Sequence, residues 1–103
     1  PEEEPEEESA TIIYADENKE EEKVAPKNKT DFQSDELQKI VGGYFEFINL
    51  IINGKKMIMV VNDEGALRSL PYNEMATFIY EKFKGGIHPI HGDVLLCRID
   101  QIQ

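Results

Sequence analysis

The stretch that decides the fold is residues 44–62, YFEFINLIINGKKMIMVVN. Two runs of β-branched, aromatic and long apolar residues flank Asn53-Gly54, the dipeptide that most strongly indicates a two-residue hairpin turn, because both positions tolerate positive φ. Both faces of the two strands are largely apolar, so we expect the hairpin to lie centrally in a covered sheet. The pairs that this turn predicts are Ile52 with Lys55, Leu50 with Met57 and Ile48 with Met59.

A short helix is predicted immediately before this hairpin. Ser34 is a good N-cap residue, and apolar side chains recur at helical spacing between Leu37 and Val41. Gly42 and Gly43 end the helix, since glycine readily adopts the left-handed conformation of a C-cap. These two glycines follow a helix and lead into a strand, so we interpret them as a structural turn rather than a phosphate cradle.

After the hairpin, helical spacing predicts a second helix over about residues 72–84, ended by Gly85-Gly86. A last strand is predicted over residues 94–100. The expected apolar stripe of the helix comprises Tyr72, Met75, Ala76, Ile79 and Phe83, and the expected core face of the strand comprises Leu95, Cys97 and Ile99.

The N-terminal part divides into a tail and a charged hairpin. Residues 1–9, PEEEPEEES, form an acidic low-complexity run, which is typical of disorder because like charges repel and prolines interrupt helices. A strand over residues 11–15 and a charged return strand over residues 21–25 follow, the latter suited to a sheet edge. The pattern predicts one α+β domain over residues 10–103, with two layers, a mostly antiparallel sheet of about five strands and two short helices, in the order ββ-α-ββ-α-β.

Charge narrows the classes of partner. The formal net charge is −10, and residues 1–23, with 11 acidic side chains and two lysines, account for −9 of it. Basic residues are scattered, which disfavours direct binding to nucleic acid or to an anionic membrane. A protein partner stays open, and a homodimer is possible if the helices leave part of the apolar hairpin bare. One cysteine and no secretory signal favour the cytoplasm.

Several short motifs follow one another along the chain in an order that resembles the pattern of a known family. They are DFQSDELQKIVGG (31–43), VVNDEG (60–65), LPYN (70–73), Ala76-Thr77 and GDVL (92–95). The ordered set resembles a small domain family of unknown function common in phages, plasmids and conjugative elements, notably of gut bacteria. The resemblance implies a small α+β domain and no established activity, cofactor or catalytic residue.

Two asparagine-containing segments are the candidate binding contacts. Asn62, Asp63, Glu64 and Gly65 form an exposed turn, and Asn73 follows Pro71 near the start of the second predicted helix. Exposed loops often carry binding residues. The structural alternative is a turn in which Asn62 or Asp63 bonds its own backbone, with Asn73 as an N-cap.

A histidine-containing loop suggests a different chemistry. His88, His91 and Asp93 offer imidazole and carboxylate ligands, which zinc accepts, and Cys97 is close in sequence. Cys97 is expected on a core strand, where a reactive thiolate is disfavoured. The chain has no nucleotide-binding fingerprint, so we expect no cofactor and no bound metal.

Three functional hypotheses follow. The first is a non-enzymatic module for protein–protein interaction, including modulation of host or defence proteins by a mobile element. The second is a small metal-dependent or hydrolytic enzyme that uses His88, His91 and Asp93. The third is an acidic mimic of nucleic acid that competes for a basic protein.

Overall fold

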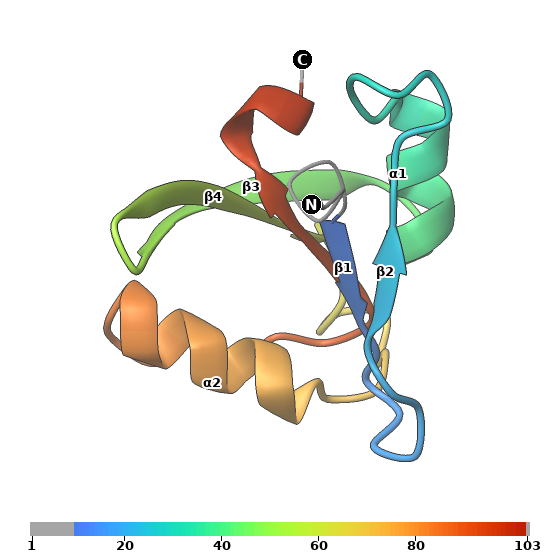
Figure 1. The fold of residues 1–103 in the computed structure, drawn as a ribbon. Coiled ribbons are helices and arrows are strands. Elements are labelled where there is room, and N and C mark those ends of the chain that lie inside the picture. Colours follow the sequence, from blue (N-terminus) through green and yellow to red (C-terminus); the bar gives the residue numbers. More distant parts are fainter. Residues whose placement is uncertain (1–9, 103) are drawn as a thin grey trace.

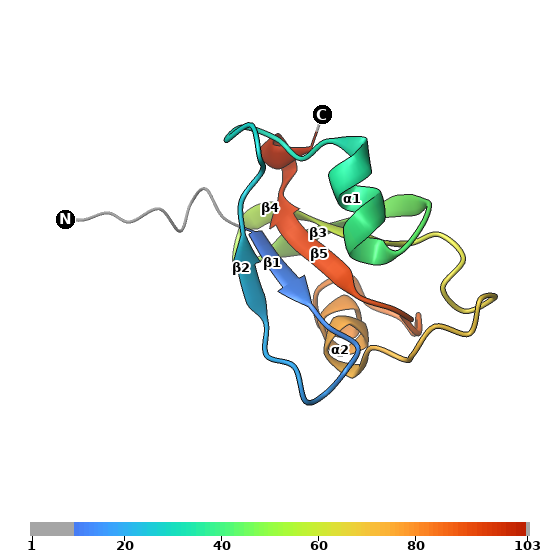
Figure 2. The ribbon, with the colours of Figure 1, turned by 90° about the vertical axis from the view of Figure 1, so that its right-hand side faces the viewer.

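The computed structural model describes residues 10–102, and these form a five-stranded sheet with one helix on each face (Figures 1 and 2). The elements are β1 (Ala10–Ile13), β2 (Glu22–Val24), α1 (Ser34–Val41), β3 (Phe45–Ile52), β4 (Lys55–Asn62), α2 (Glu74–Phe83), β5 (Val94–Arg98) and a 3-10 turn, η2 (Ile99–Gln101). The strand order is β2-β1-β5-β4-β3, and each neighbouring pair is antiparallel. The predicted fold class and element order are confirmed, while the expected disorder of residues 1–9 lies outside the described residues.

The two helices lie on opposite faces, so the sheet is the middle layer rather than one of only two layers (Figure 1). Each helix packs its apolar side chains on the strands beneath it. On the α1 face the buried cluster includes Leu37, Val41, Ile58, Val60, Leu95 and Cys97. On the α2 face it includes Leu50, Met59, Val61, Ala76, Ile90 and Val94.

The register of the β3–β4 hairpin is confirmed, whereas its predicted central position is wrong. Ile52 pairs with Lys55, as the two-residue turn requires, and Asn53 adopts a positive φ of 52°. However, β5 pairs with β4, so β3 lies at the edge of the sheet. Because β3 has a neighbouring strand on one side only, Phe47 and Ile51 on its second apolar face are exposed instead of buried.

The start of α1 differs from the sequence expectation. The N-cap is Gln33 rather than Ser34, and the backbone N–H of Gln33 donates to Glu36 Oε1 at 2.8 Å. The Glu36 carboxylate therefore closes the first turn from within the helix, which removes the need for a serine cap. Gly42 ends the helix at φ 85°, as predicted.

The other C-terminal expectations need smaller corrections. α2 begins at Glu74, because Asn73 caps it, and of the predicted stripe Tyr72 and Met75 are about half exposed. β5 ends at Arg98, where the chain turns into η2 and leaves Ile99 exposed. Within residues 10–102, no helix has both the length and the apolar character needed to cross a membrane.

Candidate functional site

The segments that carry the predicted site residues meet in one junction at the end of the sheet. Gly92 N–H donates to the Pro71 carbonyl at 2.7 Å, and His91 Nδ1 lies 3.0 Å from the Leu70 carbonyl oxygen. A Cβ at Gly65 would lie 2.6 Å from the His91 carbonyl oxygen, so the two backbones touch directly. The structure thus brings the 62–65 turn and the 88–93 loop together by close packing.

Asn73 joins three parts of this junction. Its side chain is fully buried, and its oxygen accepts the Ala76 N–H at 3.0 Å, which caps α2. Its amide nitrogen donates to the Ile13 carbonyl at 3.0 Å and to the Gly92 carbonyl at 2.9 Å. Three of the four hydrogen bonds available to this amide are therefore made inside the protein.

Asn62 also has an internal role. Its Nδ2 donates to the Val41 carbonyl at 3.0 Å, and its Oδ1 accepts the Glu64 N–H at 2.8 Å. The second bond is the turn in which an asparagine bonds the backbone two residues on. The carboxylates of Asp63 and Glu64 are exposed, so they are the side chains of this turn that face solvent.

The histidine-containing loop has separate partners for each candidate group. The His88 ring stacks on Tyr80 with centroids 4.8 Å apart, and Asp93 Oδ1 accepts the Ala15 N–H at 2.9 Å. Among residues 10–102, no three His, Cys, Asp or Glu side chains gather in a way that holds a metal. Burial raises the pKa of the Cys97 thiol to about 12, so this thiol is protonated at neutral pH.

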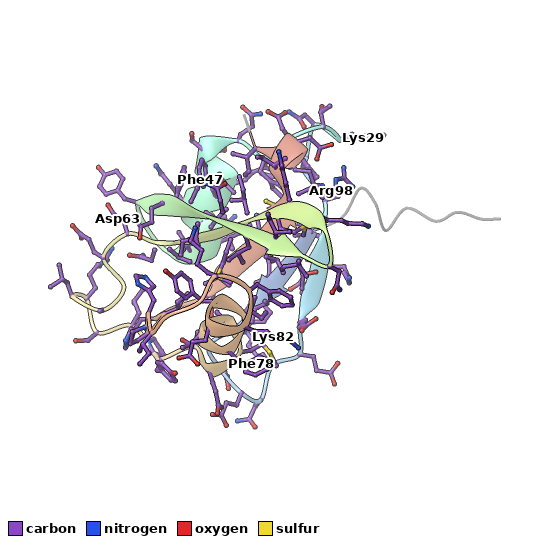
Figure 3. All side chains as sticks on the ribbon, turned by 90° about the vertical axis from the view of Figure 1, so that its left-hand side faces the viewer. Lys29, Phe47, Asp63, Phe78, Lys82 and Arg98 are labelled. Atoms are coloured by element: carbon purple, nitrogen blue, oxygen red, sulfur yellow. The ribbon has the colours of Figure 1, made fainter. Side chains whose placement is uncertain are left out.

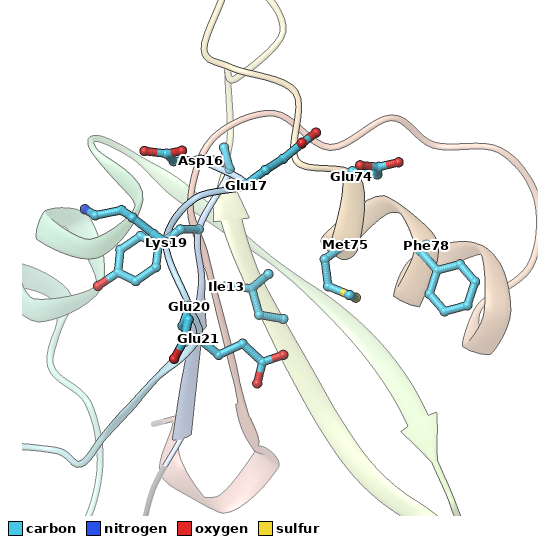
Figure 4. Close-up of a pocket in the computed structure, with 11 residues that line it drawn as sticks. Ile13, Asp16, Glu17, Lys19, Glu20, Glu21, Glu74, Met75 and Phe78 are labelled. Carbon is cyan, nitrogen blue, oxygen red and sulfur yellow. The ribbon is translucent and has the colours of Figure 1, made fainter.

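A groove of about 900 Å³ opens beside the junction, between the end of β1, the loop that follows it, and the first turns of α2 (Figure 4). Its apolar lining includes Ile13, Met75 and Phe78, and the last two are about half exposed. The charged groups that line the groove are five carboxylates and one ammonium group, which belong to Asp16, Glu17, Glu20, Glu21, Glu74 and Lys19. The groove combines an apolar floor with a strongly negative rim.

The walls of the groove are fixed to each other by the junction. Asn73 ties the β1 carbonyl of Ile13 to the start of α2, and Asp93 holds the next turn through the Ala15 N–H. The single lysine of the rim lies over Tyr14, which also lines the groove, with its Nζ 4.4 Å from the centroid of the ring. With five carboxylates against this one ammonium group, the groove is a preformed surface of net negative charge.

The comparisons with known proteins give the family. The sequence model of a family described as a domain of unknown function (DUF3846) matches residues 10–102. The chain belongs to this family. DUF3846 membership confirms the expected resemblance to a small family of unknown function. No curated protein and no solved structure matches the chain.

Sequence reasoning missed the groove of this DUF3846 domain. Met75 was expected in the core, and Phe78 was not singled out, yet both line the groove. Two signals in the sequence point to it. The helix 74–83 carries apolar residues on more than one face, and a dense acidic run follows the apolar β1 strand directly.

Proposed function

We propose that this domain is a non-enzymatic protein-binding module, and that the groove between β1 and α2 binds a positively charged segment with apolar side chains. The observation that carries the proposal is the half-exposed pair Met75 and Phe78 beneath a rim of five carboxylates. A basic segment supplies the charges that this rim lacks. Its apolar side chains would cover the two exposed α2 residues.

The two parts of the groove have different tasks in this proposal. Apolar side chains that lose water in a central pocket supply most of the binding energy in protein interfaces. Exposed charges at a rim mainly raise the association rate and select among partners. We therefore expect Phe78 to set affinity, and the carboxylates of Glu20 and Glu21 to set the salt dependence.

We infer the class of partner from the family resemblance. A domain of this type from a mobile element acts, in this proposal, on a protein of the host cell, including its defence proteins, in the cytoplasm. The exposed carboxylates of Asp63 and Glu64, which do not line the groove, form a second, separate negative contact in this proposal. The buried side chains of Asn62 and Asn73 support these surfaces rather than touch the partner.

Peptide binding tests the groove directly. The probe is a fluorescent peptide with alternating Lys and Leu residues, compared with the same peptide carrying Glu in place of Lys, by fluorescence anisotropy. We expect the chain to bind only the basic peptide, with an affinity that falls as salt rises. Phe78→Ala should weaken binding about tenfold, the effect of losing about 1.4 kcal/mol at one anchor residue.

Matched variants control for surface changes in general. Leu67→Ala removes a large exposed side chain outside the groove and should leave binding unchanged. Glu20→Lys reverses a rim charge, whereas Asp35→Lys makes the same reversal at an exposed position of α1, across the sheet from the groove. Equal effects of the paired variants, or equal binding of the basic and acidic peptides, would contradict the proposal.

A further inference from the structure

The outer edge of β3 presents an unpaired row of backbone groups. The Asp63 N–H donates to the Tyr44 carbonyl, so Tyr44 belongs to a hydrogen-bonded pair with β4. Because such pairs alternate along an antiparallel ladder, the even-numbered residues of β3 bond β4. The residues whose N–H and C=O groups point away from β4 are Phe45, Phe47, Asn49 and Ile51.

This edge has few of the features that normally prevent pairing. β3 contains no proline and no lysine, its one charged residue is Glu46 near its start, and its register with β4 runs without a bulge through eight residues. Edges are usually shortened, charged, bulged or covered, because a long flat apolar edge recruits another strand. The opposite edge, β2, has only three residues and carries Glu22 and Lys23. The fold blunts one edge of its sheet and leaves the other available.

The side chains along the open edge are apolar and exposed. Phe47 is 42% exposed and lies on the face of β3 away from α2 (Figure 3). Ile51 is 60% exposed and lies on the same face, because side chains alternate along a strand. Asn49 lies between them on the same face. An open hollow of about 550 Å³ next to this part of β3 has Asn49, Leu50, Ile51 and Phe83 among its lining residues.

We propose that β3 pairs antiparallel with β3 of a second copy of this chain, with Asn49 on the two-fold axis. In this register Phe47 of each copy lies opposite Ile51 of the other, so the exposed apolar side chains cover each other. The outward backbone groups form about six hydrogen bonds across the axis. If one copy is shifted along the other by two residues in either direction, an apolar side chain lies opposite Asn49, and Phe47 no longer faces Ile51.

Self-complementarity favours a second copy over an unrelated strand. A two-fold interface requires a surface that complements itself, and the sequence FINLI around Asn49 is apolar on both sides of a central amide. An asparagine side chain both donates and accepts, so the two Asn49 amides can bond to each other. The register also places Glu46 of one copy opposite Ile52 of the other, whose partner within its own hairpin is Lys55, so these opposite charges lie one strand apart on the same face.

The oligomeric state of the full chain tests the proposal. Sedimentation velocity over a dilution series should show a dimer that dissociates on dilution. Asn49→Pro removes an outward N–H that makes no bond to β4, so it should give a folded monomer. Ile51→Lys should raise the dimer dissociation constant about tenfold or more, because it buries an ammonium group in each half of the interface. Leu67→Lys, at an even more exposed apolar residue away from β3, should leave the dimer dissociation constant unchanged.

Crosslinking tests the register. Asn49→Cys should be joined rapidly by a short bismaleimide, while Glu46→Cys should not, because the two copies of residue 46 lie about 20 Å apart. Buried Cys97 leaves the introduced thiol as the reactive one. A monomer at every concentration, or a dimer that survives in folded Asn49→Pro, would overturn the pairing. Crosslinking at residue 46 instead of 49 would overturn the register. The groove residues take no part in either measurement, so failure here leaves the proposed function standing.

Discussion

Replacing Asn73 tests whether this residue serves as a structural bridge rather than only as a helix cap. Asn73→Ala leaves the Ala76 N–H without its cap, which costs about 1 kcal/mol. It also removes the donor from the Ile13 and Gly92 carbonyls, each buried, at about 1 kcal/mol apiece. We expect the free energy of unfolding to fall by about 3 kcal/mol, and the midpoint temperature by about 12–24 °C.

Asn73→Asp separates the two roles. Aspartate keeps an oxygen for the Ala76 N–H but places a second oxygen against two carbonyls in a site with no exposed area. If Asn73 acted only as a helix cap, aspartate would replace it at little cost in stability. If Asn73 also bridges the two carbonyls, Asn73→Asp should be at least as destabilising as Asn73→Ala at neutral pH. Burial and the carbonyls raise the folded pKa of the introduced carboxyl above its unfolded value. The deficit relative to the parent chain therefore shrinks as the pH falls.

The assay is urea unfolding followed by circular dichroism, at one fixed protein concentration so that any self-association contributes equally. Asn18→Ala, at an exposed asparagine, is the matched control and should change the free energy of unfolding by less than about 0.5 kcal/mol. An Asn73→Asp variant as stable as the parent chain would refute the bridge and leave only the cap.

Two further predictions concern stability and thiol chemistry. Gly65→Ala should lower the free energy of unfolding by about 2 kcal/mol, because its Cβ would overlap the His91 carbonyl oxygen, whereas Gly85→Ala, which meets only open space, should cost about 1 kcal/mol for its positive φ. Equal urea midpoints for the two variants would show that the junction relaxes freely. Burial raises the pKa of Cys97 to about 12 from its ordinary 9.0, so the stability tied to the neutral thiol is present below pH 9 and is lost as the pH rises through about 12. A thiol reagent at mildly alkaline pH should therefore react only as fast as the chain unfolds, and rapid labelling of the folded chain would contradict this.

The sequence predicted the helices and strands because the residues that start, stop or turn each element lie within a few positions of it. Asn53-Gly54 set the hairpin register, and the Gly42 C-cap was predicted for the same reason. Asn73, a candidate binding contact, takes the N-cap role that the sequence had left open as its alternative. The position of β3 in the sheet depends on which strand pairs with β4, a choice made by β5 some forty residues later. Apolar residues on both faces of β3 are equally consistent with a central strand and with an edge that another molecule covers.

The junction shows why candidate contacts were hard to distinguish from structural residues. An asparagine in an irregular loop is suited to binding a ligand and to binding a backbone, and the sequence does not state which groups lie nearby. The fold places the Asn62 amide against Val41 and the Asn73 amide against Ile13, partners 21 and 60 positions away. Only the topology reveals such bonds, because the fold brings the end of α1, which carries the Val41 carbonyl, and the end of β1, which carries the Ile13 carbonyl, alongside these asparagines.

The same reasoning explains the groove. α2 carries apolar side chains around much of its circumference, and the sheet covers only the side with Ala76, Ile79 and Phe83. Met75 and Phe78 therefore stay exposed, and the loop after β1 surrounds them with carboxylates instead of apolar residues. A loop that served only to shield the helix would present apolar side chains to Phe78. A loop that places negative charge around an apolar floor keeps the floor accessible and selects a positively charged partner. The rim therefore supports a binding function for this face as much as the floor does.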